Sequence, residues 1–117
     1  MIKNAIASLA VKNIGKAGKW YEKFFGRPAD SRPEKDLYEW RFAGGGWLQI
    51  YLGEDRAGNG SCTLAVANLG DEIARLRAIG VNVGTPTDSS TVSVIMIKDP
   101  DGNSIALAEA MDHEIAQ

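Results

Sequence analysis

The chain has 117 residues, of which 44% are hydrophobic and 24% are charged, a composition typical of one soluble globular domain. Its 13 Lys and Arg and 15 Asp and Glu residues give a net charge of −2 and form no basic stripe, which argues against nucleic acid or an anionic membrane as a partner. No apolar run approaches the roughly 20 residues of a bilayer span. The single cysteine, Cys62, cannot form an internal disulfide, so we expect a cytoplasmic protein.

The first half of the chain predicts one helix and four strands. Residues 5–12 alternate small or polar side chains with apolar ones, as a strand does. Asn13 is expected to cap a helix over residues 14–25, and Gly26 suits the left-handed position that ends it. The remaining expected strands cover residues 28–32, 37–43 and 47–52, the last two joined by Gly44-Gly45-Gly46.

The second half predicts the same order of elements after a polar, glycine-rich link at residues 53–60. A strand at 61–66 leads to Asn68, the expected cap of a helix over 69–79 that Gly80 closes. Three more strands are expected, at 81–83, 91–98 and 103–109, with a turn at 99–102 before the last. Residues 110–117 are expected to form a frayed tail.

The two halves are also related by a sequence repeat. The segment SLAVKNI, which starts at Ser8, returns as TLAVANL from Thr63, 55 residues later, with four of the seven positions identical. A repeat of this kind indicates a duplicated module. We therefore expect a single domain over residues 1–117, made of one module at about 4–53 and another at about 61–109.

Three features together resemble the vicinal oxygen chelate superfamily, which includes glyoxalase I, bleomycin-resistance proteins and extradiol dioxygenases. They are the paired β-α-β-β-β plan with Leu-Ala-Val-x-Asn in each half, the helix end YEKFFG at residues 21–26, and the turn KDPDGNSI at 98–105. The resemblance covers about residues 4–109. It implies an α+β fold in which two modules curl into an open barrel around a cleft, usually in a homodimer.

The resemblance also implies four positions at which enzymes of this family hold a divalent metal. In this sequence they are occupied by Ile6, Gln49, Ser61 and Ala106. Only Gln49 offers a donor atom, and a lone neutral amide is a poor ligand compared with imidazole or carboxylate. Strand alternation turns Glu109 away from the face of Ala106, and His113 lies in the tail. We expect no metal and no cofactor.

If the resemblance sets the strand register, small, hydroxylated and aromatic side chains face the cleft. Strand aromatics often only pack across strands, but a concave aromatic surface with a few polar groups is typical of a small-molecule site. Flat rings could stack on Trp47 and Tyr51, and hydroxyl or amide groups could orient a ligand. The expected ligand-binding residues are Trp47, Gln49, Tyr51, Ser8, Ser61, Thr63, Trp40 and Arg41.

Trp40 and Arg41 are alternatives at the same place. A two-residue turn at Gly44-Gly45 puts Trp40 beside Gln49, whereas a three-residue turn puts Arg41 there. Arg41 would supply an anion-binding group in the cleft. The sequence leaves both turns open.

No nucleophile with an adjacent base is visible, and Cys62 is expected on the packed face as an inert thiol. The leading hypothesis is a metal-free, dimeric protein that binds a planar or partly apolar small molecule in an aromatic cleft. The alternative is a lyase, isomerase or dioxygenase-like enzyme with an atypical or metal-independent site. A third is a structural or regulatory dimer without a ligand.

Overall fold

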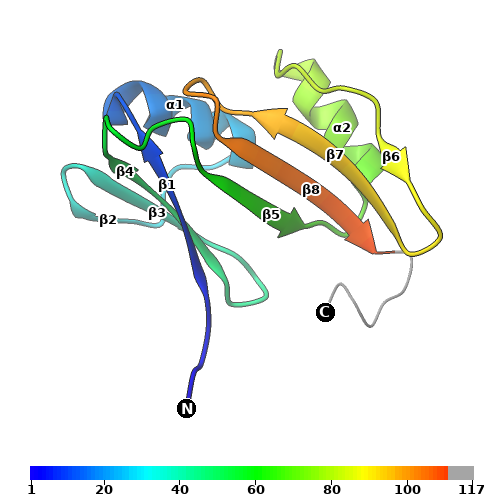
Figure 1. Cartoon of the computed structure of the whole chain (residues 1–117), viewed down its shortest axis with the longest axis horizontal. Coiled ribbons are helices and arrows are strands. Elements are labelled where there is room, and N and C mark those ends of the chain that lie inside the picture. Colours follow the sequence, from blue (N-terminus) through cyan, green and yellow to red (C-terminus); the bar gives the residue numbers. More distant parts are fainter. Residues whose placement is uncertain (111–117) are drawn as a thin grey trace. The chain divides into compact units, whose positions relative to one another are not determined.

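The computed structural model describes residues 1–110, and the chain divides into two compact units (Figure 1). The first comprises residues 1–60 together with 99–103, and the second comprises residues 61–98 and, among the described residues, 104–110. Within residues 1–110, each unit contains one helix and one four-stranded mixed sheet. The two sheets are not closed into a barrel. The predicted α+β class and the β-α-β-β-β order of each module are confirmed.

The first unit has the sheet order β1-β4-β3-β2, in which β1 runs parallel to β4 and the other pairs are antiparallel. Its elements are β1 (Ile6–Val11), α1 (Ile14–Phe25), β2 (Ser31–Glu34), β3 (Leu37–Arg41) and β4 (Trp47–Leu52). The second unit repeats this arrangement with the sheet order β5-β8-β7-β6. Its elements are β5 (Ser61–Ala65), α2 (Leu69–Ala78), β6 (Thr87–Asp88), β7 (Val92–Lys98) and β8 (Ser104–Ala110).

Both helices start at the predicted asparagine caps. The side-chain oxygen of Asn13 accepts a hydrogen bond from the N–H of Lys16 at 3.0 Å, and that of Asn68 accepts one from Asp71 at 2.9 Å. Each cap satisfies one backbone donor that has no partner within the helix, which stabilises a helix by about 1 kcal/mol. Gly26 ends α1 with φ 75°, the left-handed conformation expected there. No helix in residues 1–110 is long and apolar enough to cross a membrane.

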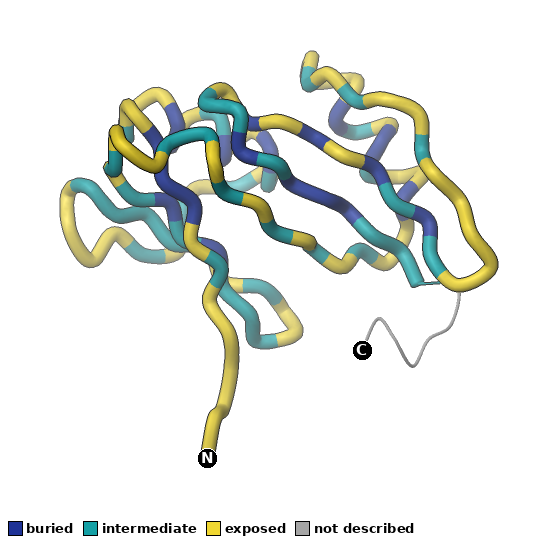
Figure 2. The backbone as a smooth tube through the Cα atoms, viewed as in Figure 1, coloured by how far each residue is buried: buried dark blue, intermediate teal, exposed yellow. Residues whose placement is uncertain are grey.

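Strands β4 and β7 alternate between a packed face and a more exposed face, as Figure 2 shows along β7. In the first unit the packed face includes Leu9, Leu48 and Ile50, all at most 1% exposed, and α1 adds buried Tyr21 and Phe24. In the second unit Ile95, Ile97, Ile105 and Leu107 form the corresponding layer with the apolar stripe of α2. Burying each such side chain contributes roughly 1.5–3 kcal/mol.

The turn from Asp99 to Gly102 belongs to the first unit, although the strands that it joins belong to the second. The hydroxyl of Tyr21 donates to Asp99 Oδ2 at 2.7 Å, and the amide of Asn103 donates to the carbonyl of Ala10 at 2.8 Å. Asp99 is 4% exposed and Asn103 is fully buried. The DPDGN sequence therefore serves as more than a tight turn, because its buried polar side chains tie it to α1 and β1.

Two predicted strands lie elsewhere. The second strand of the first module is Ser31–Glu34, not 28–32, and the second strand of the second module is Thr87–Asp88, not 81–83. The N–H of Val81 instead donates to the carbonyl of Leu76 at 2.9 Å and helps to close α2, so it is not available to a strand. The predicted frayed tail lies outside the described residues except for Ala110, which ends β8.

Candidate functional site

The sheet of the first unit has one face turned away from α1, which we call the open face. Backbone pairing fixes its members, because residues paired across strands share a face. Ser8 pairs with Gln49, Gln49 pairs with Glu39, and Arg41 pairs with Trp47. The open face therefore consists of Ile6, Ser8, Ala10, Leu37, Glu39, Arg41, Trp47, Gln49 and Tyr51.

The centre of the open face is a chain of three hydrogen-bonded side chains. Ser8 Oγ donates to Gln49 Oε1 at 2.7 Å, and Gln49 Nε2 donates to Glu39 Oε2 at 2.9 Å. The amide of Gln49 is thus oriented by a partner at each end. Glu39 is a site residue that we did not predict. The sequence does indicate that Glu39 lies on the opposite face of its strand from Trp40, because charged and aromatic residues alternate there.

The register between β3 and β4 agrees with neither of the two predicted turns, because Glu39 stands opposite Gln49. Trp40 pairs with Leu48 on the packed face and is 0% exposed, so it is a core residue and its prediction as a ligand-binding residue is wrong. Its indole N–H donates to the carbonyl of Arg27 at 3.0 Å. Arg41 takes the open face, but it pairs with Trp47 rather than standing beside Gln49 as predicted.

Arg41 lies at the edge of the open face with its backbone fixed. Its N–H donates to Asp30 Oδ2 at 2.6 Å, and its carbonyl accepts from the Arg27 guanidinium. The hydrogen bond from the Arg27 side chain, and then the one from the Arg41 backbone, lower the pKa of Asp30 below its ordinary value. The Arg41 guanidinium carbon is 5.9 Å from the centre of the Trp47 ring, near the outer limit of a cation–π contact.

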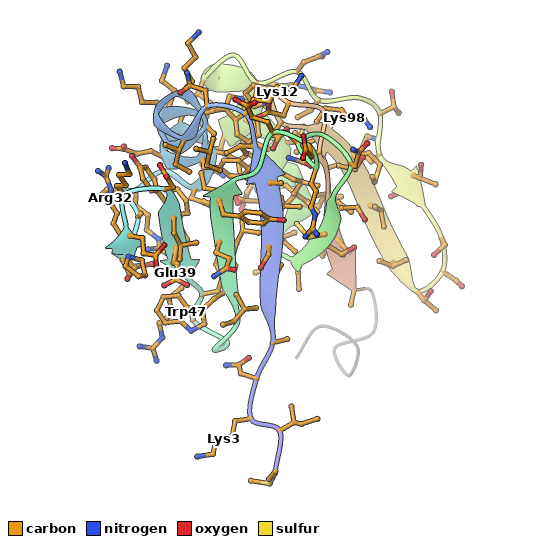
Figure 3. All side chains as sticks on the ribbon, turned by 60° about the vertical axis from the view of Figure 1, so that its left-hand side comes forward. Lys3, Lys12, Arg32, Glu39, Trp47 and Lys98 are labelled. Atoms are coloured by element: carbon orange, nitrogen blue, oxygen red, sulfur yellow. The ribbon has the colours of Figure 1, made fainter. Side chains whose placement is uncertain are left out.

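Trp47 and Tyr51 stand on either side of Gln49 on β4, and both are half-buried. Figure 3 shows Trp47 and Glu39 on neighbouring strands of the first sheet. A shallow pocket of about 340 Å³ lies beside Tyr51, lined also by Gly53, Glu54, Asp55 and Arg56. The predicted aromatic residues of β4 thus remain accessible to a ligand.

Ser61 and Thr63 belong to the second unit, where they are exposed on the face of its sheet that carries Ser104 and Ala106. Cys62 points to the other face, paired with Ile105, and is half-buried. Glu109 also turns away from the face of Ala106, as predicted. Its carboxylate accepts a hydrogen bond at 2.6 Å from the N–H of Leu69, at the start of α2. That carboxylate therefore caps a helix.

The donor atoms do not fit the metal site of the enzymes that the sequence resembles. Ile6 and Ala106 have no donor, Ser61 has only a hydroxyl, and the amide of Gln49 is already held by Ser8 and Glu39. A stable site needs three or four imidazole, thiolate or carboxylate ligands. Residues 1–110 contain no group of three or more His, Cys, Asp or Glu side chains placed to hold a metal ion. His113 lies outside the described residues.

Comparison with known proteins identifies the family. Residues 4–107 match the model of the Glyoxalase/Bleomycin resistance protein/Dioxygenase superfamily. This match spans most of the chain, so the chain belongs to that superfamily. No curated protein sequence matches significantly.

Solved structures agree with this assignment. A glyoxalase/bleomycin resistance protein from Catenulispora acidiphila is 28% identical, with a TM-score of 0.84 over 92% of this chain and 98% of that one. TnmS3, an antibiotic binding protein from a Streptomyces species, is 22% identical, with a TM-score of 0.79 over 94% and 97%. A bleomycin resistance determinant encoded on transposon Tn5 is 15% identical, with a TM-score of 0.80 over 95% and 100%. The last two likenesses concern the fold alone.

Proposed function

We propose that this chain is a metal-free small-molecule-binding protein whose ligand, planar or partly apolar, lies on the open face of the first sheet. The observation that carries the proposal is the open face itself. There, accessible Trp47 and Tyr51 flank the oriented amide of Gln49. Flat aromatic surface gives a ligand contact area, and a fixed polar group gives it one orientation.

The names of two structural neighbours support a binding role. One is described as an antibiotic binding protein and the other as a bleomycin resistance determinant. Binding that keeps a toxic compound away from its target needs affinity but no catalytic group, which agrees with the set of side chains on the open face. We propose Ser61 and Thr63 as further hydrogen-bonding residues on the sheet of the second unit, where both are exposed.

We propose further that the protein is a cytoplasmic homodimer and that its 117 residues form one domain. The lone cysteine suits a reducing compartment. Within residues 1–110, the outer strands β1 and β5 each pair on one side only in their sheets, and a second copy could cover such edges. Light scattering at micromolar concentration should give twice the mass of one chain, and a strict monomer would refute the dimer.

The metal-free part of the proposal is tested by elemental analysis of the purified protein. At the four expected metal positions, only Gln49 has a side chain with an amide, and none has an imidazole or a carboxylate. We therefore expect less than about 0.1 equivalent of Ni, Zn, Fe or Mn per chain. One tightly held transition metal per chain would contradict this and favour the enzyme alternative.

Binding is tested by fluorescence titration of wild type and Trp47→Ala with bleomycin-like and flat aromatic compounds. Removing a stacking ring should weaken binding by about 1–3 kcal/mol. Leu48→Ala is the matched comparison, since Leu48 is the fully buried neighbour on β4 and its truncation should cost about 2–5 kcal/mol of stability. Thermal melting should show a smaller loss for Trp47→Ala. If it unfolds the protein as readily as Leu48→Ala and no compound quenches wild-type fluorescence, the proposal fails.

A further inference from the structure

We propose that Glu39 recognises a positively charged nitrogen of the ligand, so that the ligands of this protein are organic cations such as aromatic or apolar amines in their protonated form. This inference rests on the proposed function, because it assigns a chemical class to the ligand of the same open face.

The first argument is the hydrogen bonding of the Glu39 carboxylate. Glu39 is half-buried, and among residues 1–110 Gln49 is the one group that donates a hydrogen bond to its carboxylate, at Oε2. Oε1 keeps its accepting capacity. A carboxylate can accept up to about four hydrogen bonds, and a partly buried one gains free energy from each partner that replaces lost water. Glu39 therefore has room for a donor supplied by a ligand.

The second argument is charge. The described residues provide no ion-pair partner for Glu39. Arg41 shares its face but holds its guanidinium near Trp47, 5.9 Å from the ring centre. A single neutral amide donor leaves the negative charge of Glu39 uncompensated. A protonated nitrogen beside it would form a charge-assisted hydrogen bond, about twice as strong as a neutral one.

The third argument is what surrounds the carboxylate. On β4, the residues next to Gln49 on the open face are Trp47 and Tyr51, and Gln49 pairs directly with Glu39. The faces of aromatic rings attract cations, by about 0.5–2 kcal/mol depending on solvation. Negative charge and ring faces thus favour the same sign of ligand, while an anion would meet repulsion from Glu39.

Three probes of matched shape separate charge from stacking: 1-naphthylmethylamine, which is a cation at pH 7, neutral 1-naphthalenemethanol and anionic 1-naphthoate. Isothermal titration would measure each against wild type and Glu39→Gln, which keeps an acceptor of the same size but removes the charge. Glu22→Gln is the control, because Glu22 is exposed on α1 and its replacement makes the same change in net charge.

We expect wild type to bind the amine about tenfold more tightly than the alcohol, and the naphthoate least tightly; tenfold corresponds to about 1.4 kcal/mol. Glu39→Gln should remove the preference for the amine and leave alcohol binding within about twofold, whereas Glu22→Gln should keep the preference. The amine-to-alcohol ratio of wild type tests the inference even if Glu39→Gln does not fold.

Three results would overturn the inference, and they differ in what they say about the open face. Equal binding of amine and alcohol by wild type, or an unchanged preference in folded Glu39→Gln, would remove the role of Glu39 but leave an aromatic binding site. Failure of all three probes to bind wild type would remove the site together with the role of Glu39.

Discussion

Tyr21→Phe should weaken the attachment of the Asp99–Gly102 turn within the first unit while leaving the packing of the core in place. Tyr21 is 0% exposed, and its hydroxyl donates to Asp99 Oδ2 at 2.7 Å. The phenylalanine keeps the ring contacts with Trp20 and Phe24, whose centres lie 4.8 and 6.2 Å from that of Tyr21. The substitution therefore removes the buried hydrogen bond from Tyr21 to Asp99 and keeps the ring.

The size of the loss follows from what remains around Asp99. A hydrogen bond to a charged group contributes about 1.5–3 kcal/mol. Asp99 Oδ2 still accepts from the Asn103 amide at 2.8 Å, and Oδ1 still accepts from the backbone N–H groups of Asp101 and Asn103, both at 2.9 Å. Because the carboxylate is not left without donors, we expect the lower end, about 1.5 kcal/mol in the free energy of unfolding.

Urea unfolding followed by circular dichroism measures this difference. With an m-value of about 1–3 kcal/mol per M, the midpoint should fall by roughly 0.5–1.5 M. Tyr51→Phe is the control, since Tyr51 lies on the open face and its hydroxyl makes no hydrogen bond within residues 1–110; it should change stability by less than about 0.5 kcal/mol. If the two variants unfold alike, the buried hydrogen bond of Tyr21 does not stabilise the fold as we argue.

Two further predictions concern the backbone and pH. Gly58 has φ 86°, and a Cβ added there would lie 2.2 Å from the carbonyl oxygen of Asp101. Gly58→Ala should therefore destabilise the first unit by more than the roughly 1–2 kcal/mol that left-handed strain alone would cost. Gly44→Ala is the control and should be nearly neutral in thermal melting, because a Cβ added at Gly44 would have no atom within 4 Å. The pKa of Asp30 is lowered, first by its hydrogen bond from Arg27, so the stability that it contributes is present above its unfolded pKa and lost as pH falls through the folded value. Asp30→Asn should accordingly be less stable than wild type at pH 7 and equal to it once Asp30 is protonated, and a difference that persists at the lowest pH would refute the linkage.

The elements that the sequence predicts well are those specified by local chemistry. These signals are asparagine before each helix, glycine after α1, and alternation along β1, β4, β7 and β8. Each acts within a few residues, and the structure contains the helices and strands that they predict. The packed side chains of β1 and β4 follow from the same alternation. The family resemblance then indicates which residues of distant strands share a face, which local pattern alone cannot give.

The register of the β3–β4 hairpin is where the prediction is weakest, and the reason is the run of three glycines. Glycine permits several turns, and each turn shifts the pairing of β3 against β4. In the structure the N–H of Gly45 donates to the carbonyl of Phe42, Gly45 has φ 100°, and Glu39 stands opposite Gln49. The identity of the residue beside Gln49 therefore depended on a turn that the composition leaves undetermined.

The same hydrogen bonds bear on metal binding and on ligand recognition. Gln49 occupies a position at which relatives of this fold are expected to hold a metal, yet its oxygen accepts from Ser8 and its nitrogen donates to Glu39. A metal at this position would have to compete for the amide oxygen and would find Ile6, without a donor, on the adjacent strand. For an organic ligand these bonds have the opposite effect, because they hold the amide and the carboxylate in fixed positions before binding and so reduce the entropy lost when the complex forms. The donor atoms therefore fit a metal site poorly, and the fixed amide and carboxylate agree with the small-molecule binding that we propose.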